Sequence, residues 1–166
     1  MFQSISHTEI TEWKMLTSQK LVLLNNETTT YIDNNGEFWT IFGTPYCHIF
    51  GNWPFMISDE ALAEKFKEIP EEVDIIISHD PPYGVGFHDC NLQKPYSRSV
   101  GPEHLGNKPL REQLEKTKFK LGVFGHIHSS DHNPTEFMGA TVVGVSLLDE
   151  YYQPTYKPFI TELEKW

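Results

Sequence analysis

The first third of the chain has the hydrophobic pattern of short β-strands. Strands are predicted at residues 21–24 (LVLL), 28–33 (TTTYID) and, with regular alternation, 37–43 (EFWTIFG). The intervening residues 34–36 (NNG) readily adopt positive φ in a tight turn. The pattern therefore predicts a β-hairpin, with a helical stretch before it at residues 8–16.

Two later segments have the caps and the spacing of short helices. Ser58 is a good N-cap, and acidic residues follow it in the first turn, where the helix macrodipole stabilises negative charge. A second helix is predicted over residues 108–117, in which Leu110 and Leu114 lie one turn apart on the same face. Both segments are therefore interpreted as helices with one apolar face.

Apolar strands alternate with these helices. Residues 73–78 (VDIIIS) and 120–125 (KLGVFG) are largely apolar, as expected for strands that are buried on both faces. A long polar loop rich in Gly and Pro runs from residue 79 to about residue 106. Further strands are predicted at residues 141–148 (TVVGVSLL) and 158–164 (PFITELE). This order of elements predicts a layered α/β domain.

The length of 166 residues suits one domain, taken as residues 1–166. With 39% hydrophobic and 22% charged residues, the composition is that of a soluble globular protein. The sequence contains no apolar run of the ~20 residues that a membrane span needs. Its start lacks the layout of a signal peptide, so we expect a cytoplasmic protein that does not associate with membranes.

The charge balance narrows the range of partners. The net charge is −10, from 23 acidic and 13 basic residues. This balance argues against a broad nucleic-acid-binding surface, which needs Lys and Arg to neutralise phosphates. A phosphorylated small molecule remains compatible, because bound metal ions would supply local positive charge. Cys47 and Cys90 are expected to be ordinary reduced thiols, since their spacing suggests neither a zinc site nor a disulfide framework.

Histidines stand at two junctions between a strand and a loop. His79 follows the apolar run in IIISHDPPYG, and His126 and His128 follow the next one in GVFGHIH. Residues two apart on an extended segment point the same way, and the carboxyl ends of strands in α/β sheets are where ligands bind. These three imidazoles are candidate ligands for zinc, manganese, iron or nickel.

The same segments resemble a known family. SHDPP after an apolar strand, followed by a helix, a strand and GHIH, is similar to the closing motifs of the calcineurin-like metallophosphoesterases. The segments IFGTPY, FGNWPF and LGNKPLREQLEKTKFKLGVFGHIHSS look most like the small phosphoesterases related to the brain protein 239 group. The resemblance covers roughly residues 28–163 and implies a layered β-sandwich flanked by helices.

The resemblance also implies a chemistry. The family holds two divalent metal ions and hydrolyses a phosphomonoester or phosphodiester with a metal-bound hydroxide, so no side chain is predicted as a covalent catalyst. By resemblance, His79 and His126 would bind one metal ion and His128 the other.

Several further residues are assigned by weaker arguments. His88 and Arg98, in the long loop, are candidate substrate-binding residues, and a guanidinium fork suits phosphate oxygens. Asp80 is a candidate for orienting His79. His104, in the same loop as His88, is a candidate for a similar role. We expect His7, His48 and His132 to be surface or hydrogen-bonded residues and Trp53 and Phe55 to lie in the core.

The sequence departs from the family pattern in one respect. The family site also uses Asp-x-His, Gly-Asp and Gly-Asn-His, and this sequence contains none of them in an appropriate place. The two Gly-Asn pairs are followed by Trp53 and Lys108. The resemblance is therefore to the C-terminal half of the domain, without its N-terminal strands.

This departure leaves three hypotheses. The chain is a phosphoesterase completed by a partner chain that carries the N-terminal half or by a second copy in a homo-oligomer, or it is a truncated and inactive remnant. In the third hypothesis it binds a metal ion or a phosphorylated ligand without turnover.

Overall fold

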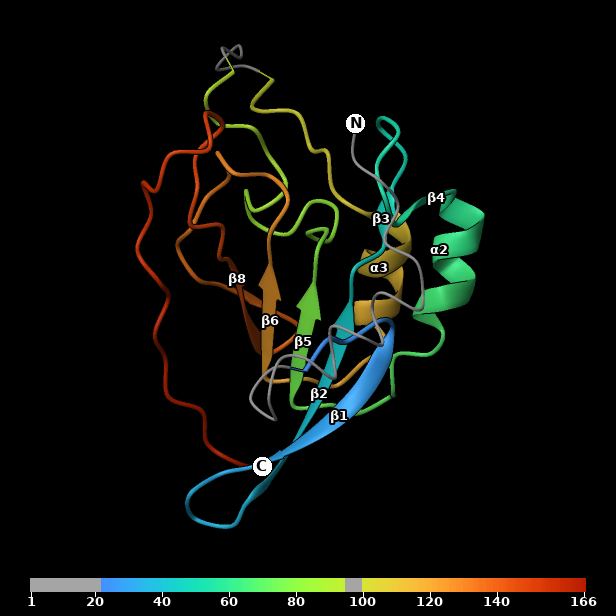
Figure 1. Ribbon diagram of the computed structural model, residues 1–166, viewed down its shortest axis with the longest axis vertical. Coiled ribbons are helices and arrows are strands. Elements are labelled where there is room, and N and C mark those ends of the chain that lie inside the picture. Colours follow the sequence, from blue (N-terminus) through green and yellow to red (C-terminus); the bar gives the residue numbers. More distant parts are fainter. Residues whose placement is uncertain (1–21, 95–99) are drawn as a thin grey trace.

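The computed structural model describes residues 22–94 and 100–166, and the helix predicted at residues 8–16 lies outside them. Within the described residues, a mixed six-stranded sheet has the strand order β1-β2-β5-β6-β8-β7 (Figure 1). Its strands are β1 (Glu27–Ile32), β2 (Phe38–Thr44), β5 (Ile75–Ser78), β6 (Leu121–Phe124), β7 (Thr135–Phe137) and β8 (Ala140–Gly144). A separate two-stranded sheet pairs β3 (Cys47–His48) with β4 (Met56–Ile57).

The predicted hairpin is confirmed. β1 pairs antiparallel with β2, and Gly36 in the connecting turn has a φ of 83°, which glycine adopts without steric cost. The Asp33 side chain accepts hydrogen bonds from the backbone amides of Asn35 and Glu37 and so stabilises the turn. The described part of the strand predicted at residues 21–24 is irregular instead.

Four central strands determine where the loops gather. β2, β5, β6 and β8 run parallel, and their last residues Thr44, Ser78, Phe124 and Gly144 are aligned in register. Their carboxyl ends therefore lie at one edge of the sheet, where the long loops emerge (Figure 1).

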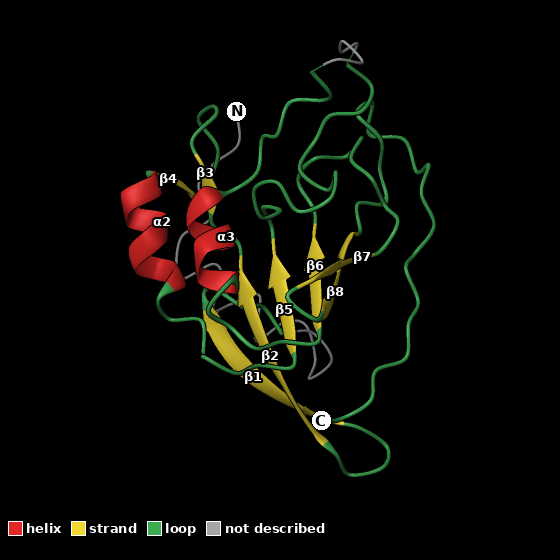
Figure 2. Ribbon diagram, turned by 180° about the vertical axis from the view of Figure 1, so that it is seen from behind, coloured by secondary structure: helices red, strands yellow, loops and turns green. Residues whose placement is uncertain are grey.

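Helices α2 (Asp59–Phe66) and α3 (Lys108–Leu114) lie side by side against the sheet (Figure 2). Ser58 caps α2 as predicted, and its side chain accepts a hydrogen bond from the Ala61 amide. The second helix ends at Leu114, three residues before its predicted end. The apolar faces of both helices are buried with the sheet in one core, whose deeply buried side chains include Phe42, Leu62, Phe66, Val73, Ile76, Leu110, Leu114, Phe124 and Val142.

A buried carboxylate holds several elements together at the end of the sheet opposite the loops. Asp74, just before β5, accepts hydrogen bonds from the amide and hydroxyl of Thr40 at 2.7 and 2.9 Å. The Lys165 ammonium donates a third, at 2.7 Å, because the last residues of the chain run back along the sheet to this end (Figure 1).

Two strand predictions near the end of the chain need correction. The strand predicted at residues 141–148 stops at Gly144, and residues 158–164 form no strand. β7, which the sequence pattern did not predict, pairs with β8 at the sheet edge instead. The α/β class is confirmed, whereas the sandwich and the lack of N-terminal strands stay predictions.

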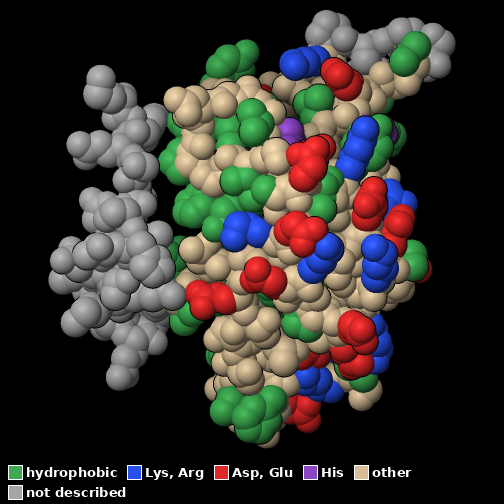
Figure 3. Space-filling model, turned by 90° about the vertical axis from the view of Figure 1, so that its right-hand side faces the viewer, with side chains coloured by type: hydrophobic (Ala, Val, Ile, Leu, Met, Phe, Trp, Pro, Cys, Tyr) green, Lys and Arg blue, Asp and Glu red, His purple; other side chains and the backbone are tan. Residues whose placement is uncertain are grey.

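On the side that carries α2, Lys and Arg side chains are interspersed with Asp and Glu and form no continuous basic surface (Figure 3). Among the helices that the structure describes, none is long and apolar enough to cross a membrane.

Candidate metal centre

Two of the predicted histidines meet at the carboxyl ends of β5 and β6. His79 follows β5 directly, and His126 is the second residue after β6, whose last residue pairs with the last residue of β5. The Gly125 amide donates a hydrogen bond to the His79 carbonyl oxygen at 3.1 Å, which joins the two loops at their start. His126 Nδ1 and His79 Nε2 lie 2.9 Å apart, and the two rings meet edge to face at an angle of 61°.

The backbone of His126 adopts an unusual conformation. Its φ of 65° lies in the left-handed region, which residues with a side chain visit rarely. Such strain is common where a fold must aim a side chain at a site. Here it turns the chain immediately after β6 and brings the imidazole over the end of β5.

The third predicted histidine lines the same cavity. A cavity of about 710 Å³ opens at this edge of the sheet and is lined by His79, His126, His128, Glu150 and Tyr152, among other residues. His128 Nδ1 lies 2.9 Å from the Asp149 carbonyl oxygen, and its ring meets Tyr152 edge to face. The structure therefore brings all three histidines to one cavity, with His79 and His126 in contact.

Asp80 lies beneath this pair and is fully buried. Its Oδ2 accepts hydrogen bonds from the His48 amide and the Asn107 side chain, both at 3.0 Å, and lies 2.8 Å from His48 Nδ1. Its Oδ1 is buried without a hydrogen-bond partner among the described residues and lies 3.8 Å from His126 Nε2. A buried carboxylate oxygen left unpaired is uncommon in folded proteins and points to a functional constraint.

Burial keeps the two facing imidazoles neutral. It lowers the pKa of His126 to about 4, and it also lowers the pKa of His79. Burial alone would raise the pKa of Asp80, but hydrogen bonds from His48 and Asn107 outweigh it and hold that pKa below its usual range. The hydrogen bond to Asp80 raises the pKa of His48. Near pH 7 the site thus combines two neutral imidazoles with an ionised carboxylate.

Comparisons with known proteins identify relatives of the chain. Human metallophosphoesterase domain-containing protein 1 is 36% identical over 124 residues, which cover 74% of this chain and 35% of that protein, and the mouse protein matches to the same extent. The chain belongs to a metallophosphoesterase-like family. This confirms the family predicted from SHDPP and GHIH.

A relative in Caenorhabditis elegans, UPF0046 protein C25E10.12, is 27% identical over 164 residues, or 97% of this chain and 56% of that protein. The chain thus spans between about a third and somewhat over half of the length of these metallophosphoesterase-like relatives. A scan against protein-family models finds no match.

Membership of a metallophosphoesterase-like family implies divalent metal ions, and the residues at the cavity fit them. Two imidazoles on one zinc ion stand about 3.3 Å apart, so His79 and His126 need only a small separation from their 2.9 Å contact. A backbone carbonyl that holds one ring nitrogen, as the Asp149 carbonyl does for His128, is typical of metal-binding histidines. The unpaired Asp80 oxygen supplies negative charge nearby.

The described part of the cavity lining includes neither of the two predicted substrate-binding residues. His88 is 1% exposed, and its Nδ1 lies 2.9 Å from the Asp131 carbonyl oxygen rather than at the cavity lining. Arg98 lies outside the described residues. The role of either in substrate binding stays a prediction.

Sequence reasoning missed other residues of the site. His48 was expected to be a surface or hydrogen-bonded residue, and it does hydrogen-bond, but to the carboxylate under the candidate centre. Trp53 and Phe55, expected in the core, line the cavity instead, with Trp53 49% exposed. No local pattern indicated these positions, because His48, Trp53 and Phe55 are placed by residues that are distant in sequence, such as Asp80 and His126.

Proposed function

We propose that this chain is a metal-dependent phosphoesterase domain that binds divalent metal ions with His79, His126 and His128. The single observation that carries the proposal is the pair of neutral imidazoles, His79 and His126, over the buried carboxylate of Asp80, which has one unpaired oxygen, at the edge of a large cavity. The family of the curated relatives supports the same reaction class.

The side chains have separable tasks in this proposal. His79 and His126 present unprotonated ring nitrogens, because burial disfavours their charged forms. Asp80 offsets positive charge at the centre and, through His48 and Asn107, ties the centre to β3 and to the start of α3. Divalent metal ions bound here would polarise a phosphoryl oxygen and stabilise charge on the reacting group.

The cavity sets the expected substrate class. Its volume of about 710 Å³ is in the range of small-molecule sites, and its lining includes the aromatic residues Phe50, Trp53 and Tyr152. Net charge of −10 opposes an anionic substrate unless metal ions neutralise the centre locally. We therefore expect a phosphorylated small molecule with an apolar part.

The proposal includes a second polypeptide. The Asp-x-His, Gly-Asp and Gly-Asn-His motifs of the family do not occur in this sequence, and two adjacent dications need more negative charge than Asp80 alone provides. We propose that a second copy of this chain, or a chain carrying the complementary half of the domain, supplies the remaining ligands.

Native mass spectrometry with manganese or zinc tests the assembly, because it counts chains and metal ions together. Hydrolysis of bis(p-nitrophenyl) phosphate and p-nitrophenyl phosphate by the same preparation tests the activity. We expect metal-dependent turnover from an assembly of more than one chain. Metal binding by a folded monomer without turnover would overturn the enzymatic proposal and favour a binding module.

Two histidine variants test the assignment of the centre. His126→Ala is expected to abolish turnover and reduce bound manganese at least about tenfold. The matched control is His132→Ala, because both ring nitrogens of His132 lie near backbone carbonyls, those of Ser130 and Ser146, and the residue does not line the cavity. Equal loss of bound metal in two folded variants would contradict the assignment.

A further inference from the structure

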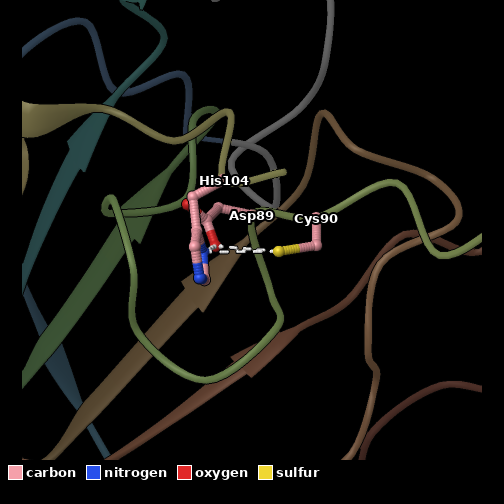
Figure 4. Close-up of side chains that lie close together, drawn as sticks. All are labelled: Asp89, Cys90 and His104. Carbon is pink, nitrogen blue, oxygen red and sulfur yellow. Dashed lines mark hydrogen bonds and ion pairs between the residues drawn. The ribbon is translucent and has the colours of Figure 1, made fainter. Parts of the chain in front are cut away.

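A second cluster of metal-binding side chains lies apart from the three histidines. Asp89 and Cys90 lie in the first half of the long loop, its first arm, and His104 lies in the second half, its second arm. The three side chains point toward one another (Figure 4). One ligand atom from each falls within 4.8 Å of the other two, an arrangement found nowhere else among the residues that the structure describes. None of the three lines the cavity of the candidate centre.

The distances within this cluster are close to those around a bound ion. Cys90 Sγ lies 3.3 Å from His104 Nδ1 and 3.6 Å from Asp89 Oδ1, and His104 Nδ1 lies 2.7 Å from that oxygen. Ligands of these types around one tetrahedral zinc ion stand about 3.3–3.6 Å apart. A shift of about 0.5 Å in the His104 ring would therefore admit the ion.

The two oxygens of Asp89 have different surroundings. Oδ2 accepts hydrogen bonds from the backbone amides of Gly84 and Gly106, at 2.9 and 3.1 Å. Oδ1 faces the thiol and the imidazole. Hydrogen bonds from amides to one carboxylate oxygen fix the orientation of the group, so the other oxygen is free to bind a metal ion. Metal-binding carboxylates are commonly oriented in this way.

Burial and access also suit an ion. Asp89 and Cys90 are fully buried, whereas the His104 side chain is 32% exposed. Protein groups thus surround the site on the inside, and the exposed side leaves room for the ring to move and for water as a fourth ligand.

The donor set selects the metal. A thiolate, an imidazole and one carboxylate oxygen suit zinc, whereas magnesium and calcium prefer oxygen ligands throughout. We infer that Asp89, Cys90 and His104 form a structural zinc site that is separate from the histidine centre. On binding, the thiol proton is released to solvent and the sulfur–metal bond forms, with no change of oxidation state.

The location suggests what the ion would do. Cys90 and His104 pair across an isolated antiparallel bridge, and the Leu105 amide donates to the Asp89 carbonyl oxygen at 2.9 Å. The next residue on each arm, Asn91 and Leu105, lines the cavity. A zinc ion held by both arms would therefore fix one wall of the cavity without touching a ligand inside it.

Cobalt(II) gives a direct test, because a thiolate bound to cobalt produces an intense near-ultraviolet absorption. The full chain, stripped of metal with a chelator, is titrated with cobalt(II) and then with zinc, which should displace the cobalt and remove the absorption. Wild type is expected to show the band, and Cys90→Ser and His104→Asn are expected to lose it, with zinc affinity reduced at least about 100-fold.

Three controls make the result specific. Cys47→Ser removes the other buried cysteine, which lines the cavity, and is expected to keep the band. His126→Ala disrupts the histidine centre and is also expected to keep it, so this site and the proposed function can fail independently. A band lost in Cys47→Ser, kept in Cys90→Ser, or absent from folded wild type would overturn the inference.

Discussion

Two buried carboxylates stand at opposite ends of β5 and have different surroundings. Asp74 precedes the strand, and one of its oxygens accepts three hydrogen bonds, from the Thr40 amide and hydroxyl and from the Lys165 ammonium. Asp80 follows the strand, and one of its oxygens is bonded while the other is buried without a partner beside His126. Both side chains are buried, but of the two only Asp80 has an oxygen that is buried without a hydrogen-bond partner among the described residues.

This difference separates a structural role from a functional one. A buried charge that accepts hydrogen bonds from several elements joins parts of the fold, and Asp74 joins β2 and the start of β5 to the end of the chain. A buried charge with an unpaired oxygen costs stability, and it is retained where a ligand completes its bonding. Asp80 therefore belongs to the candidate centre, and Asp74 belongs to the scaffold.

The largest expected effect on stability is at the scaffold carboxylate. Asp74→Ala leaves the Thr40 amide and the Lys165 ammonium without their acceptor, and it should lower the free energy of unfolding by about 3 kcal/mol. Denaturant unfolding measures this change. Manganese affinity of the folded variant should match wild type, and a parallel loss of metal would show that the two ends of β5 are not independent.

Asp80→Asn should affect metal binding more than folding. The amide retains an oxygen for the His48 and Asn107 hydrogen bonds but removes the negative charge beside His126. Manganese affinity, measured by calorimetry, is expected to fall about 10- to 100-fold. Asp74→Asn is the matched control, and an equal fall in that variant would remove the distinction drawn between the two carboxylates.

The metal-free protein should lose stability in mild acid because of His126. Its pKa is lowered from 6.5 to about 4 by burial, so the unfolded chain binds a proton at a pH where the folded protein does not. This residue leaves the free energy of unfolding unchanged above pH 6.5 and lowers it by about 3 kcal/mol as the pH falls from 6.5 toward 4. Unfolding measured across this window should show the slope in wild type and a shallower slope in His126→Ala.

Asp74 and Asp80 should affect the free energy of unfolding at a lower pH than His126 does. The pKa values of Asp74 and Asp80 lie below the usual 3.8, so their contributions persist through the His126 range and decline only as the pH falls below that value. The difference in unfolding free energy between wild type and Asp74→Ala should therefore shrink as the pH falls below 3.8, and a difference that does not change with pH would count against a stabilising role of that charge.

The smallest expected effect is at Lys165. Its side chain is 30% exposed, so solvent weakens the ion pair with Asp74, and Asp74 keeps the two hydrogen bonds from Thr40. Lys165→Met should cost about 0.5–1 kcal/mol in the free energy of unfolding. A loss as large as that of Asp74→Ala would mean that the end of the chain contributes more to the scaffold than this comparison allows.

Local signals predicted the fold where they coincide with tertiary contacts. The Asn-Asn-Gly turn, the Ser58 cap and the apolar runs of β5 and β6 specify their own conformations, and all four are present. Residues 158–164 also alternate like a strand, yet no neighbouring strand pairs with them, and a strand needs a partner for its backbone hydrogen bonds. β7 gains that partner in β8 despite a weak pattern of its own.

The candidate centre was predictable to the extent that it lies on neighbouring strands. His79 and His126 could be placed together because the ends of consecutive parallel strands share an edge of the sheet. His48 approaches Asp80 from β3, 32 residues earlier in the sequence, and His104 approaches Asp89 across the long loop. Spacing in sequence carries no information on such contacts, and the two cysteines, considered alone, gave no indication of a metal site.

One small residue connects several of these features. A Cβ atom at Gly106 would lie 2.7 Å from Asp89 Cβ and 2.8 Å from the backbone of Tyr83, distances that the chain cannot accommodate without moving both. Even alanine there would displace the amide that holds Asp89 and disturb the neighbouring Asn107, which reaches Asp80. A substitution of Gly106, a residue with no side chain of its own, would therefore disturb both candidate metal sites.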